Sequence, residues 1–260
     1  MTVDALTDAQ WRSFEADGYL RLGRLLDDDG LRVLRERLDA IMLGTADVPY
    51  DELLMQLDSS SGAYADAGAQ SNGSKGATLA YRKIQGLERD DVFLTYLQHP
   101  VFADACRRIY GAVPVATYRS MFMNKPAGGG TELPWHQDRW SWLDRDPLLT
   151  AYTAIDAATL ETGCVELALG THGSVINPSD PSAFLTDAQA DEHGLDDVAM
   201  PLELDAGEVV LLHNWLAHRS GVNGSRGPRR AFSVCYMDAR TIDPLESHCV
   251  VFDADGRAIA

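Results

Sequence analysis

In the first 110 residues, apolar positions recur every three or four residues, the period of a helix that buries one face. The first run begins with Thr7-Asp8-Ala9-Gln10, a capping-box pattern, and ends at Gly18. The second begins with three aspartates at 27–29, which favour a helix N-terminus, and ends near Gly44. Helices are therefore expected over 7–18, 27–44, 90–98 and 100–110, with their apolar faces packed on a sheet.

After Gly111 the apolar period changes to two, and residues 117–124 are rich in strand-forming side chains. Further short strands are expected at 149–155, 164–169, 208–213 and 231–237. Helices first and many short strands afterwards predict a mainly β fold, a sandwich or barrel with a helical buttress. Two segments with little periodicity, 59–76 and 177–197, are expected to be long loops, either plain excursions or lids at a pocket mouth.

The composition fits one folded domain over residues 1–260, because 45% of the residues are hydrophobic and can form one buried core. The domain is expected to be a monomer or a homodimer. The formal net charge of −17 opposes binding to a phosphate backbone or an anionic bilayer, so neither nucleic acid nor membrane is expected as a partner. There is no apolar run of about 18 residues and no signal-peptide pattern, which predicts a cytoplasmic protein. The four cysteines form no close pair and are expected to be buried thiols.

A histidine and an aspartate two residues apart, His136 and Asp138, are candidate metal ligands. In a strand, positions i and i+2 point to the same face, so both side chains can bind one ion. A distant histidine, His218, would complete a two-histidine, one-carboxylate face, which suits iron(II) and leaves positions open for other ligands. The His-x-Asp tripeptide alone is a weak signal, because it often occurs by chance. His213 is the rival for the distal position.

The surroundings of His218 strengthen this interpretation. Asn214-Trp215-Leu216-Ala217-His218-Arg219-Ser220-Gly221 follows the apolar run 209–212 and leads to Pro228-Arg229-Arg230. This arrangement resembles the phytanoyl-CoA dioxygenase family of iron(II)- and 2-oxoglutarate-dependent oxygenases. The family pattern is His-x-Asp, a distant His with a following Ser-Gly turn, and an Arg eleven residues after that His. His213 lacks both the Ser-Gly turn and the Arg.

Other stretches are similar to the family in the same chain order, over about residues 10–240. They are Phe14-Glu15-Ala16-Asp17-Gly18-Tyr19, Asn124-Lys125-Pro126, and Thr162-Gly163-Cys164-Val165-Glu166 running on to Gly170-Thr171-His172. The resemblance implies a double-stranded β-helix (jelly-roll, cupin-like) core over about 115–240. It also implies a helical N-terminal buttress over about 7–110, packed on one sheet.

The resemblance implies an enzyme that uses iron(II), 2-oxoglutarate and O2, with His136, Asp138 and His218 as the iron ligands. It would oxidise, most simply hydroxylate, a C–H bond of a small-molecule metabolite and release succinate and carbon dioxide. Desaturation, cyclisation and epimerisation stay open, as do a non-catalytic metal-binding or sensing protein and a cupin-like isomerase or hydrolase. The intact triad disfavours the last two classes. Asp138 argues against halogenation, because related halogenases have a small residue there.

Arg229, together with Ser220, would bind the far carboxylate of 2-oxoglutarate. A guanidinium suits this role because it can donate two parallel hydrogen bonds to a carboxylate. Arg230 is the rival, but neighbouring strand residues face opposite sides, so only one of the two can enter the core. Asn124, Lys125 and Tyr152 take the positions of other residues around the cosubstrate.

The substrate is expected to be a modest-sized acid, alcohol or amino-acid derivative of secondary metabolism. The lack of an extended basic groove weighs against a coenzyme A thioester. Three tryptophans, Trp135, Trp140 and Trp142, flank the ligands in the sequence. They could pack in the core or line the substrate pocket. Three arginines near the same stretches, Arg119, Arg139 and Arg145, could contact an anionic substrate, but surface ion pairing is the default interpretation for them.

Overall fold

The computed structural model describes residues 4–245 and 248–259 and contains two antiparallel sheets. The larger sheet has the order β1 (Tyr19–Arg24), β10 (Glu208–His213), β7 (Leu149–Ala154), β12 (Arg229–Asp238), β5 (Val115–Lys125), β4 (Tyr81–Gln85), β2 (Leu54–Leu57) and β3 (Ser71–Asn72), and β13 (Cys249–Phe252) also pairs with β5. The smaller sheet has the order β6 (Leu133–His136), β11 (His218–Ser220), β8 (Val165–Ala168) and β9 (Ala199–Pro201). The prediction of a mainly β, jelly-roll fold is confirmed.

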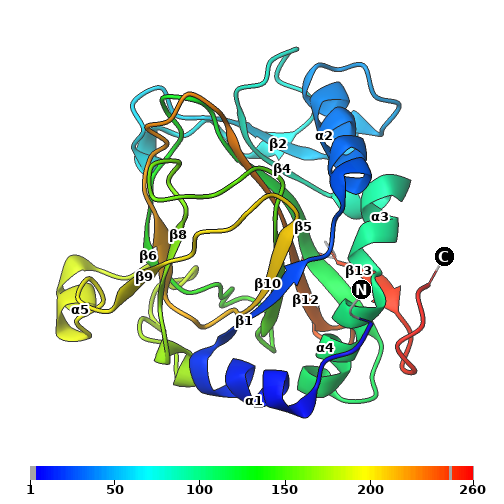
Figure 1. Ribbon diagram of the computed structural model, residues 1–260, viewed down its shortest axis with the longest axis vertical. Coiled ribbons are helices and arrows are strands. Elements are labelled where there is room, and N and C mark those ends of the chain that lie inside the picture. Colours follow the sequence, from blue (N-terminus) through cyan, green and yellow to red (C-terminus); the bar gives the residue numbers. More distant parts are fainter. Residues whose placement is uncertain (1–3, 246–247, 260) are drawn as a thin grey trace.

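The N-terminal helices cover the outer face of the larger sheet. Figure 1 shows α2, α3 and α4 on the side of this sheet opposite β6, β8 and β9. The α-helices are α1 (Asp8–Asp17), α2 (Asp28–Met42), α3 (Asp91–Leu97), α4 (Pro100–Tyr110) and α5 (Asp187–Glu192), and short 3-10 turns occupy Tyr50–Glu52, Tyr64–Asp66, Leu87–Arg89 and Thr171–Gly173. The expected capping box of Thr7 and Gln10 is present, and Gly18 ends α1 at a φ of 77°.

The alternation of β12 separates two cores. Phe232, Val234 and Tyr236 point outward into the cluster formed with the helices. Ala231 points inward into a second cluster, which also contains Val165 of the smaller sheet. Because successive strand residues face opposite sides, one strand serves both the helical layer and the interior between the sheets.

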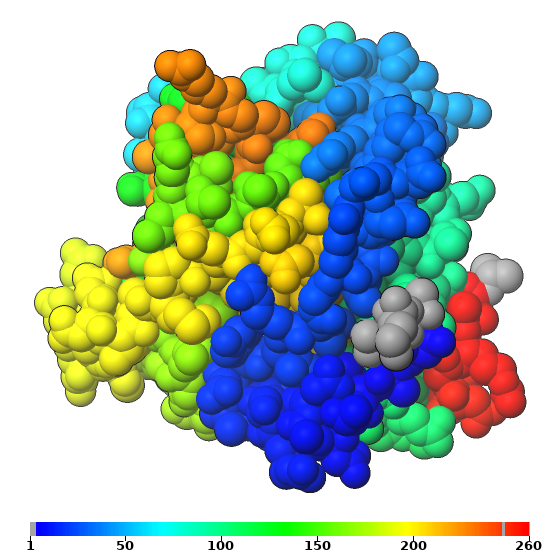
Figure 2. Space-filling view, in the orientation of Figure 1, coloured from blue at the N-terminus to red at the C-terminus, as the bar shows by residue number. Residues whose placement is uncertain are grey.

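Several elements were not expected from the sequence. The N-terminal segment supplies strands β2, β3 and β4 in addition to helices, so it extends the larger sheet as well as covering it. The segment 59–76 contains a 3-10 turn and β3, and the segment 177–197 contains α5, which projects from one side of the molecule (yellow in Figure 2). Strand β13 was also not expected. These pieces are short, and their pairing partners rather than their own apolar pattern determine their conformation.

Cysteine burial largely follows the prediction: Cys106, Cys164 and Cys235 are buried free thiols, whereas Cys249 is only partly buried. Across residues 4–245 and 248–259, the helices are all too short or too polar to cross a bilayer.

Candidate metal centre

A cavity of about 370 Å³ lies between the two sheets. Its walls include β4, β5, β7, β10 and β12 of the larger sheet, β6, β8 and β11 of the smaller sheet, and the segments 59–76 and 177–197. Volumes of this size are typical of small-molecule sites. The cavity therefore has room for small ligands in contact with both sheets.

Two histidines face each other across paired strands at this cavity. His136 is the last residue of β6, His218 is the first of β11, and the two are paired in the antiparallel register. Their ring centroids are 4.1 Å apart, and Nε2 of His218 lies 3.9 Å from Oδ2 of Asp138. Possible ligand atoms of His136, Asp138 and His218 all lie within 4.8 Å of one another. The structure thus brings the distant His218 together with His136 and Asp138, the other two predicted ligands.

Each histidine ring is held by a backbone carbonyl two residues earlier. Nδ1 of His136 lies 2.8 Å from the oxygen of Pro134, and Nδ1 of His218 lies 2.9 Å from the oxygen of Leu216. When the Nδ1 hydrogen is donated to the carbonyl, the Nε2 lone pair is left for a metal. Burial, followed by the neighbouring His218, lowers the pKa of His136 to about 4. A neutral ring is the form that binds metal.

Asp138 reaches the site from outside a strand, which corrects the expected geometry. Strand β6 ends at His136, and the backbone N–H of Asp138 donates to the carbonyl of Asn214 at 2.7 Å. This hydrogen bond fixes the carboxylate beside the histidines without a regular i, i+2 strand. Gln137 points elsewhere: its amide nitrogen donates to the carbonyls of Ser174 and Trp215.

Arg229, the first residue of β12, is a buried cation at the cavity wall, with 3% of its surface exposed. Its Nη1 donates to the Tyr152 hydroxyl at 3.0 Å, and its Nη2 donates to the Gly163 carbonyl at 2.8 Å. Its Nε is buried without a hydrogen-bond partner. Among the described residues, no carboxylate lies within ion-pair distance of this guanidinium. A buried cation in this state is costly unless an anion joins it.

Lys125 adds a second cation beside Arg229. The two residues are paired across β5 and β12, and Nζ of Lys125 donates to the Thr131 carbonyl at 2.5 Å. Burial, followed by the charges of Arg229 and Arg82, lowers the pKa of Lys125 to about 7. Burial also raises the pKa of the Tyr152 hydroxyl, which faces the same guanidinium. This end of the cavity therefore favours an anionic ligand.

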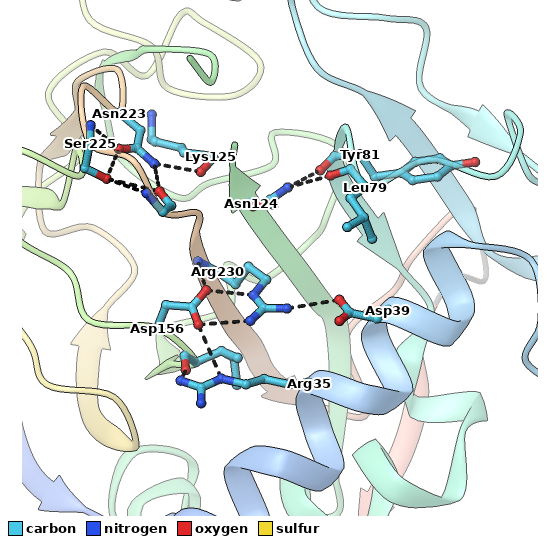
Figure 3. Close-up of polar contacts among 12 residues, drawn as sticks. Arg35, Asp39, Leu79, Tyr81, Asn124, Lys125, Asp156, Asn223, Ser225 and Arg230 are labelled. Carbon is cyan, nitrogen blue, oxygen red and sulfur yellow. Dashed lines mark hydrogen bonds and ion pairs between the residues drawn. The ribbon is translucent and has the colours of Figure 1, made fainter. Parts of the chain in front are cut away.

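Two other predicted cosubstrate residues also line the cavity, Ser220 and Asn124. Ser220 is buried at the end of β11. The amide nitrogen of Asn124 donates to the carbonyls of Leu79 and Tyr81, which ties β5 to the chain leading into β4 (Figure 3). Oδ1 of Asn124 is buried without a partner.

Arg230 lies on the opposite face of β12 from Arg229. Its guanidinium is ion-paired with Asp156 at 2.7 Å and with Asp39 of α2 at 3.0 Å, as Figure 3 shows. Asp156 also pairs with Arg35 of α2 at 3.3 Å. Arg230 therefore links the sheet to the helical layer and is absent from the cavity wall.

The three tryptophans have different positions. Trp140 and Trp142 line the cavity. Trp135 lies on the other side of β6 from His136: it packs in a small apolar cluster, its Nε1 donates to Asp196 at 2.9 Å, and Arg219 lies over its ring. Adjacent residues of a strand face opposite sides, which explains this placement.

Sequence reasoning missed several residues of the wall. Phe184 stacks on the His136 ring with centroids 5.1 Å apart, and Tyr64 and Gln70 come from the segment 59–76. Irregular segments carry no periodicity that could have identified these residues. Arg139 forms an ion pair with Asp146, as expected.

The other two arginines interpreted as ion-pairing residues differ from each other. Arg145 pairs with Asp144 and Asp238. Arg119 instead lines the cavity over the Trp140 ring.

The chain is similar in sequence to known proteins. The family model described as phytanoyl-CoA dioxygenase matches residues 14–231. A probable phytanoyl-CoA dioxygenase of Caenorhabditis elegans is 26% identical over 90% of this chain and 76% of its own length. The peroxisomal phytanoyl-CoA dioxygenase of Homo sapiens is 24% identical over 91% of this chain and 70% of its own length.

Solved structures share the fold. The non-heme alpha ketoglutarate dependent carbocyclase SnoK from nogalamycin biosynthesis superposes with a TM-score of 0.66 at 19% identity, over 93% of this chain and 87% of that one. EctD from S. alaskensis with 2-oxoglutarate and 5-hydroxyectoine gives a TM-score of 0.67 at 20% identity, over 91% and 78%. The epimerase SnoN gives 0.64 at 17% identity, over 90% and 84%.

Proposed function

The chain belongs to the phytanoyl-CoA dioxygenase family, and on this premise we propose that it is an iron(II)- and 2-oxoglutarate-dependent oxygenase that hydroxylates a C–H bond of a small-molecule metabolite. Succinate and carbon dioxide are the coproducts. The observation that carries the proposal is one cavity that contains both a two-histidine, one-carboxylate cluster and a buried arginine without a carboxylate partner.

The donor set fits iron(II). His136, Asp138 and His218 supply two imidazole nitrogens and one carboxylate oxygen on one side of a metal, which leaves the other side for exchangeable ligands. The carbonyls of Pro134 and Leu216 orient the two rings, so little rearrangement is needed for binding.

The polar end of the cavity fits 2-oxoglutarate. Arg229, with Lys125 beside it, would hold the carboxylate that is remote from the metal, and Ser220 and the Tyr152 hydroxyl would complete its hydrogen bonds. That Asn124 contacts the cosubstrate stays a prediction, since its amide nitrogen already binds two carbonyls.

Iron(II) held by His136, Asp138 and His218 would supply the redox chemistry by which oxygen and 2-oxoglutarate provide the oxidising power for attack on a C–H bond. The chain's own part is to bind and orient. Arg229 sets the direction in which the cosubstrate enters, while Trp140, Trp142 and Phe184 form walls that limit access of water to the reacting atoms.

The first test is anaerobic reconstitution with iron(II) and 2-oxoglutarate, followed by oxygen. An iron–oxoglutarate charge-transfer band and succinate formation are expected. Absence of 2-oxoglutarate binding, or of succinate across a broad panel of metabolites, would refute the oxygenase proposal and leave a metal-binding protein.

The histidines provide a matched pair of variants. His218→Ala is expected to lose iron binding at micromolar metal, because it removes one of three ligands. His213→Ala is the control, since His213 packs beside His172 and Phe14 outside the cavity wall. A charge-transfer band that survives in His218→Ala would refute the ligand assignment.

Hydroxylation is distinguished from desaturation, cyclisation and epimerisation by the product. Mass spectrometry of the product formed under 18O2 is expected to show one incorporated oxygen atom. An unlabelled product that has lost two hydrogens would indicate desaturation or cyclisation instead of hydroxylation. An unlabelled product with the mass of the substrate would indicate epimerisation.

A further inference from the structure

Apart from Arg229 and Lys125, five cations among the described residues line the cavity, and three of them lie on two neighbouring strands. These three are Arg82 and Lys83 of β4 and Arg119 of β5. Within the part of the chain that the structure describes, none of the three forms an ion pair with a carboxylate. Two other arginines of the same wall are paired, Arg139 with Asp146 at 3.2 Å and Arg219 with Glu166 at 3.2 Å. In a chain with a net charge of −17, unpaired cations gathered in one cavity need an explanation.

Aromatic rings rather than carboxylates position the two guanidiniums. Arg119 lies 4.5 Å from the centroid of the Trp140 ring, and Arg82 lies 5.1 Å from that of Tyr64. Nη1 of Arg82 also donates to the Gln56 amide oxygen at 2.9 Å. The N–H donors of a guanidinium lie in its plane, so stacking on a ring leaves that edge available to a planar acceptor.

Arg119 is separated from the proposed 2-oxoglutarate end along β5. Alternate residues of this strand line the cavity, beginning with Arg119 and ending with Lys125, which pairs with Arg229. Six residues of strand place the Cα atoms of Arg119 and Lys125 roughly 20 Å apart. Met121 and Met123 lie between them on the same wall. A five-carbon dicarboxylate held at Arg229 therefore leaves the Arg119 end for another ligand.

Charge balance indicates what that ligand is. If the proposed function holds, the charges of iron(II), Asp138, 2-oxoglutarate and Arg229 sum to zero. Arg119 then leaves an excess positive charge at the other end of the cavity. Its charge also affects Lys83: burial comes first, and the charges of Arg119 and Arg82 follow, in lowering the pKa of Lys83 to about 7. A ligand anion would offset this repulsion.

We propose that the substrate is a small organic anion whose carboxylate, or an equivalent oxyanion group, is bound by Arg119. This inference rests on the proposed function and names the substrate class of that site. The methionines of β5, together with Trp142 and Phe184, supply apolar walls for the rest of the molecule. The anionic group is thereby held at one end, and the oxidised C–H bond lies between that group and the metal ligands.

The binding test uses probes that differ only in charge. Phenylacetate and 3-phenylpropionate are each compared with their primary amides, and phenyl phosphate is included to separate a preference for phosphate from one for carboxylate. Binding is measured by equilibrium dialysis against the metal-free protein. It is also measured by perturbation of the charge-transfer band of the iron and 2-oxoglutarate complex under argon. Each acid is expected to bind roughly tenfold or more tightly than its amide.

Variants connect the preference to Arg119. Arg119→Gln is expected to reduce acid binding roughly tenfold, while amide binding and 2-oxoglutarate affinity change little. Arg119→Lys should recover only part of the loss, because ammonium lacks the planar pair of donors. Arg107→Gln, on α4 outside the cavity wall, is the control.

The outcomes separate the two proposals. No preference for acid over amide, whether both bind or neither does, overturns this inference, and so does a preference that survives in Arg119→Gln. A preference for phenyl phosphate alone keeps the anionic class and replaces carboxylate with phosphate. If the charge-transfer band never forms but dialysis shows an acid preference that Arg119→Gln removes, the oxygenase proposal fails and the anion site stands.

Discussion

At the scale of single residues, two adjacent arginines have opposite environments. Arg229 enters the cavity and has a buried Nε without a partner, whereas Arg230 is ion-paired with Asp156 and Asp39 on the helical side. Strand alternation alone accounts for this difference. The two residues therefore make a matched pair in which one mutation should alter ligand binding and the other stability.

Arg229→Gln is expected to weaken 2-oxoglutarate binding by roughly 10- to 100-fold, because charge-assisted hydrogen bonds to a carboxylate are lost. Arg230→Gln should leave that affinity nearly unchanged and lower the free energy of unfolding by about 2 kcal/mol, since Asp156 and Asp39 lose a shared partner. Anaerobic titration of the charge-transfer band and urea unfolding measure the two effects. An unchanged affinity in Arg229→Gln would transfer the carboxylate role to another cation, with Lys125 first.

At the scale of elements, the sequence predicted what periodicity encodes. Helices α1 to α4 and strands β5, β7, β8, β10 and β12 follow expected runs, because their apolar faces are long enough to show a period. The ligand pair His136 and His218 was also predicted, first as candidates from the His-x-Asp spacing and a distant histidine, and then by family resemblance.

What could not be predicted depends on contacts between distant segments. Asp138 is fixed by a hydrogen bond to Asn214, which no local pattern reveals. Arg119 was assigned to an ion pair by default, yet it lies on a tryptophan at the cavity wall. A signal was available: Arg119, Met121, Met123 and Lys125 occupy alternate positions of one strand and therefore share a face.

Two turns meet closely at Gly163, whose carbonyl also accepts a hydrogen bond from Arg229. Its φ is 69°, and a Cβ there would lie 2.5 Å from the Gly221 oxygen and 2.6 Å from the Val222 oxygen. Gly163→Ala is therefore expected to lower the free energy of unfolding by roughly 3 kcal/mol, from backbone strain and steric overlap together. It should also weaken 2-oxoglutarate binding, because the acceptor of Arg229 moves.

Gly170→Ala is the control for that variant. Gly170 has a similar φ of 76°, but nothing lies within 4 Å of a Cβ built there. Gly170→Ala should lower the free energy of unfolding by about 1 kcal/mol, from backbone strain alone. Equal losses of unfolding free energy for the two variants in urea titrations would show that the close approach of the turns contributes nothing.

At the scale of the whole molecule, the charge is unevenly distributed. The net charge is −17, yet the cavity contains cations without carboxylate partners, and burial keeps the pKa of both Lys83 and Lys125 near 7. Burial also lowers the pKa of His213 to about 4, and that of His136 shifts in the same direction. The folded metal-free protein consequently excludes protons that the unfolded chain binds.

The pH dependence of stability follows from these shifts. Each group is a cation whose pKa falls on folding, so the unfolded state binds more protons and the free energy of unfolding rises with pH. The two histidines change the free energy of unfolding between about pH 4 and pH 6.5, the ordinary pKa of histidine. The two lysines change it from about pH 7 upward. Urea unfolding of the metal-free protein should therefore show higher stability at about pH 8 than at about pH 5.

Variants separate this effect from general acid sensitivity. His213→Gln should flatten the rise below pH 6.5, because it removes a buried group with a shifted pKa. His193→Gln, at an exposed position after α5, is the control. A ligand anion would raise the pKa of Lys125, so 2-oxoglutarate should stabilise the protein less at pH 9 than at pH 7, by the same linkage. Stability that is flat from pH 5 to pH 8, or an equal stabilisation by 2-oxoglutarate at both pH values, would contradict the buried-cation account of the cavity.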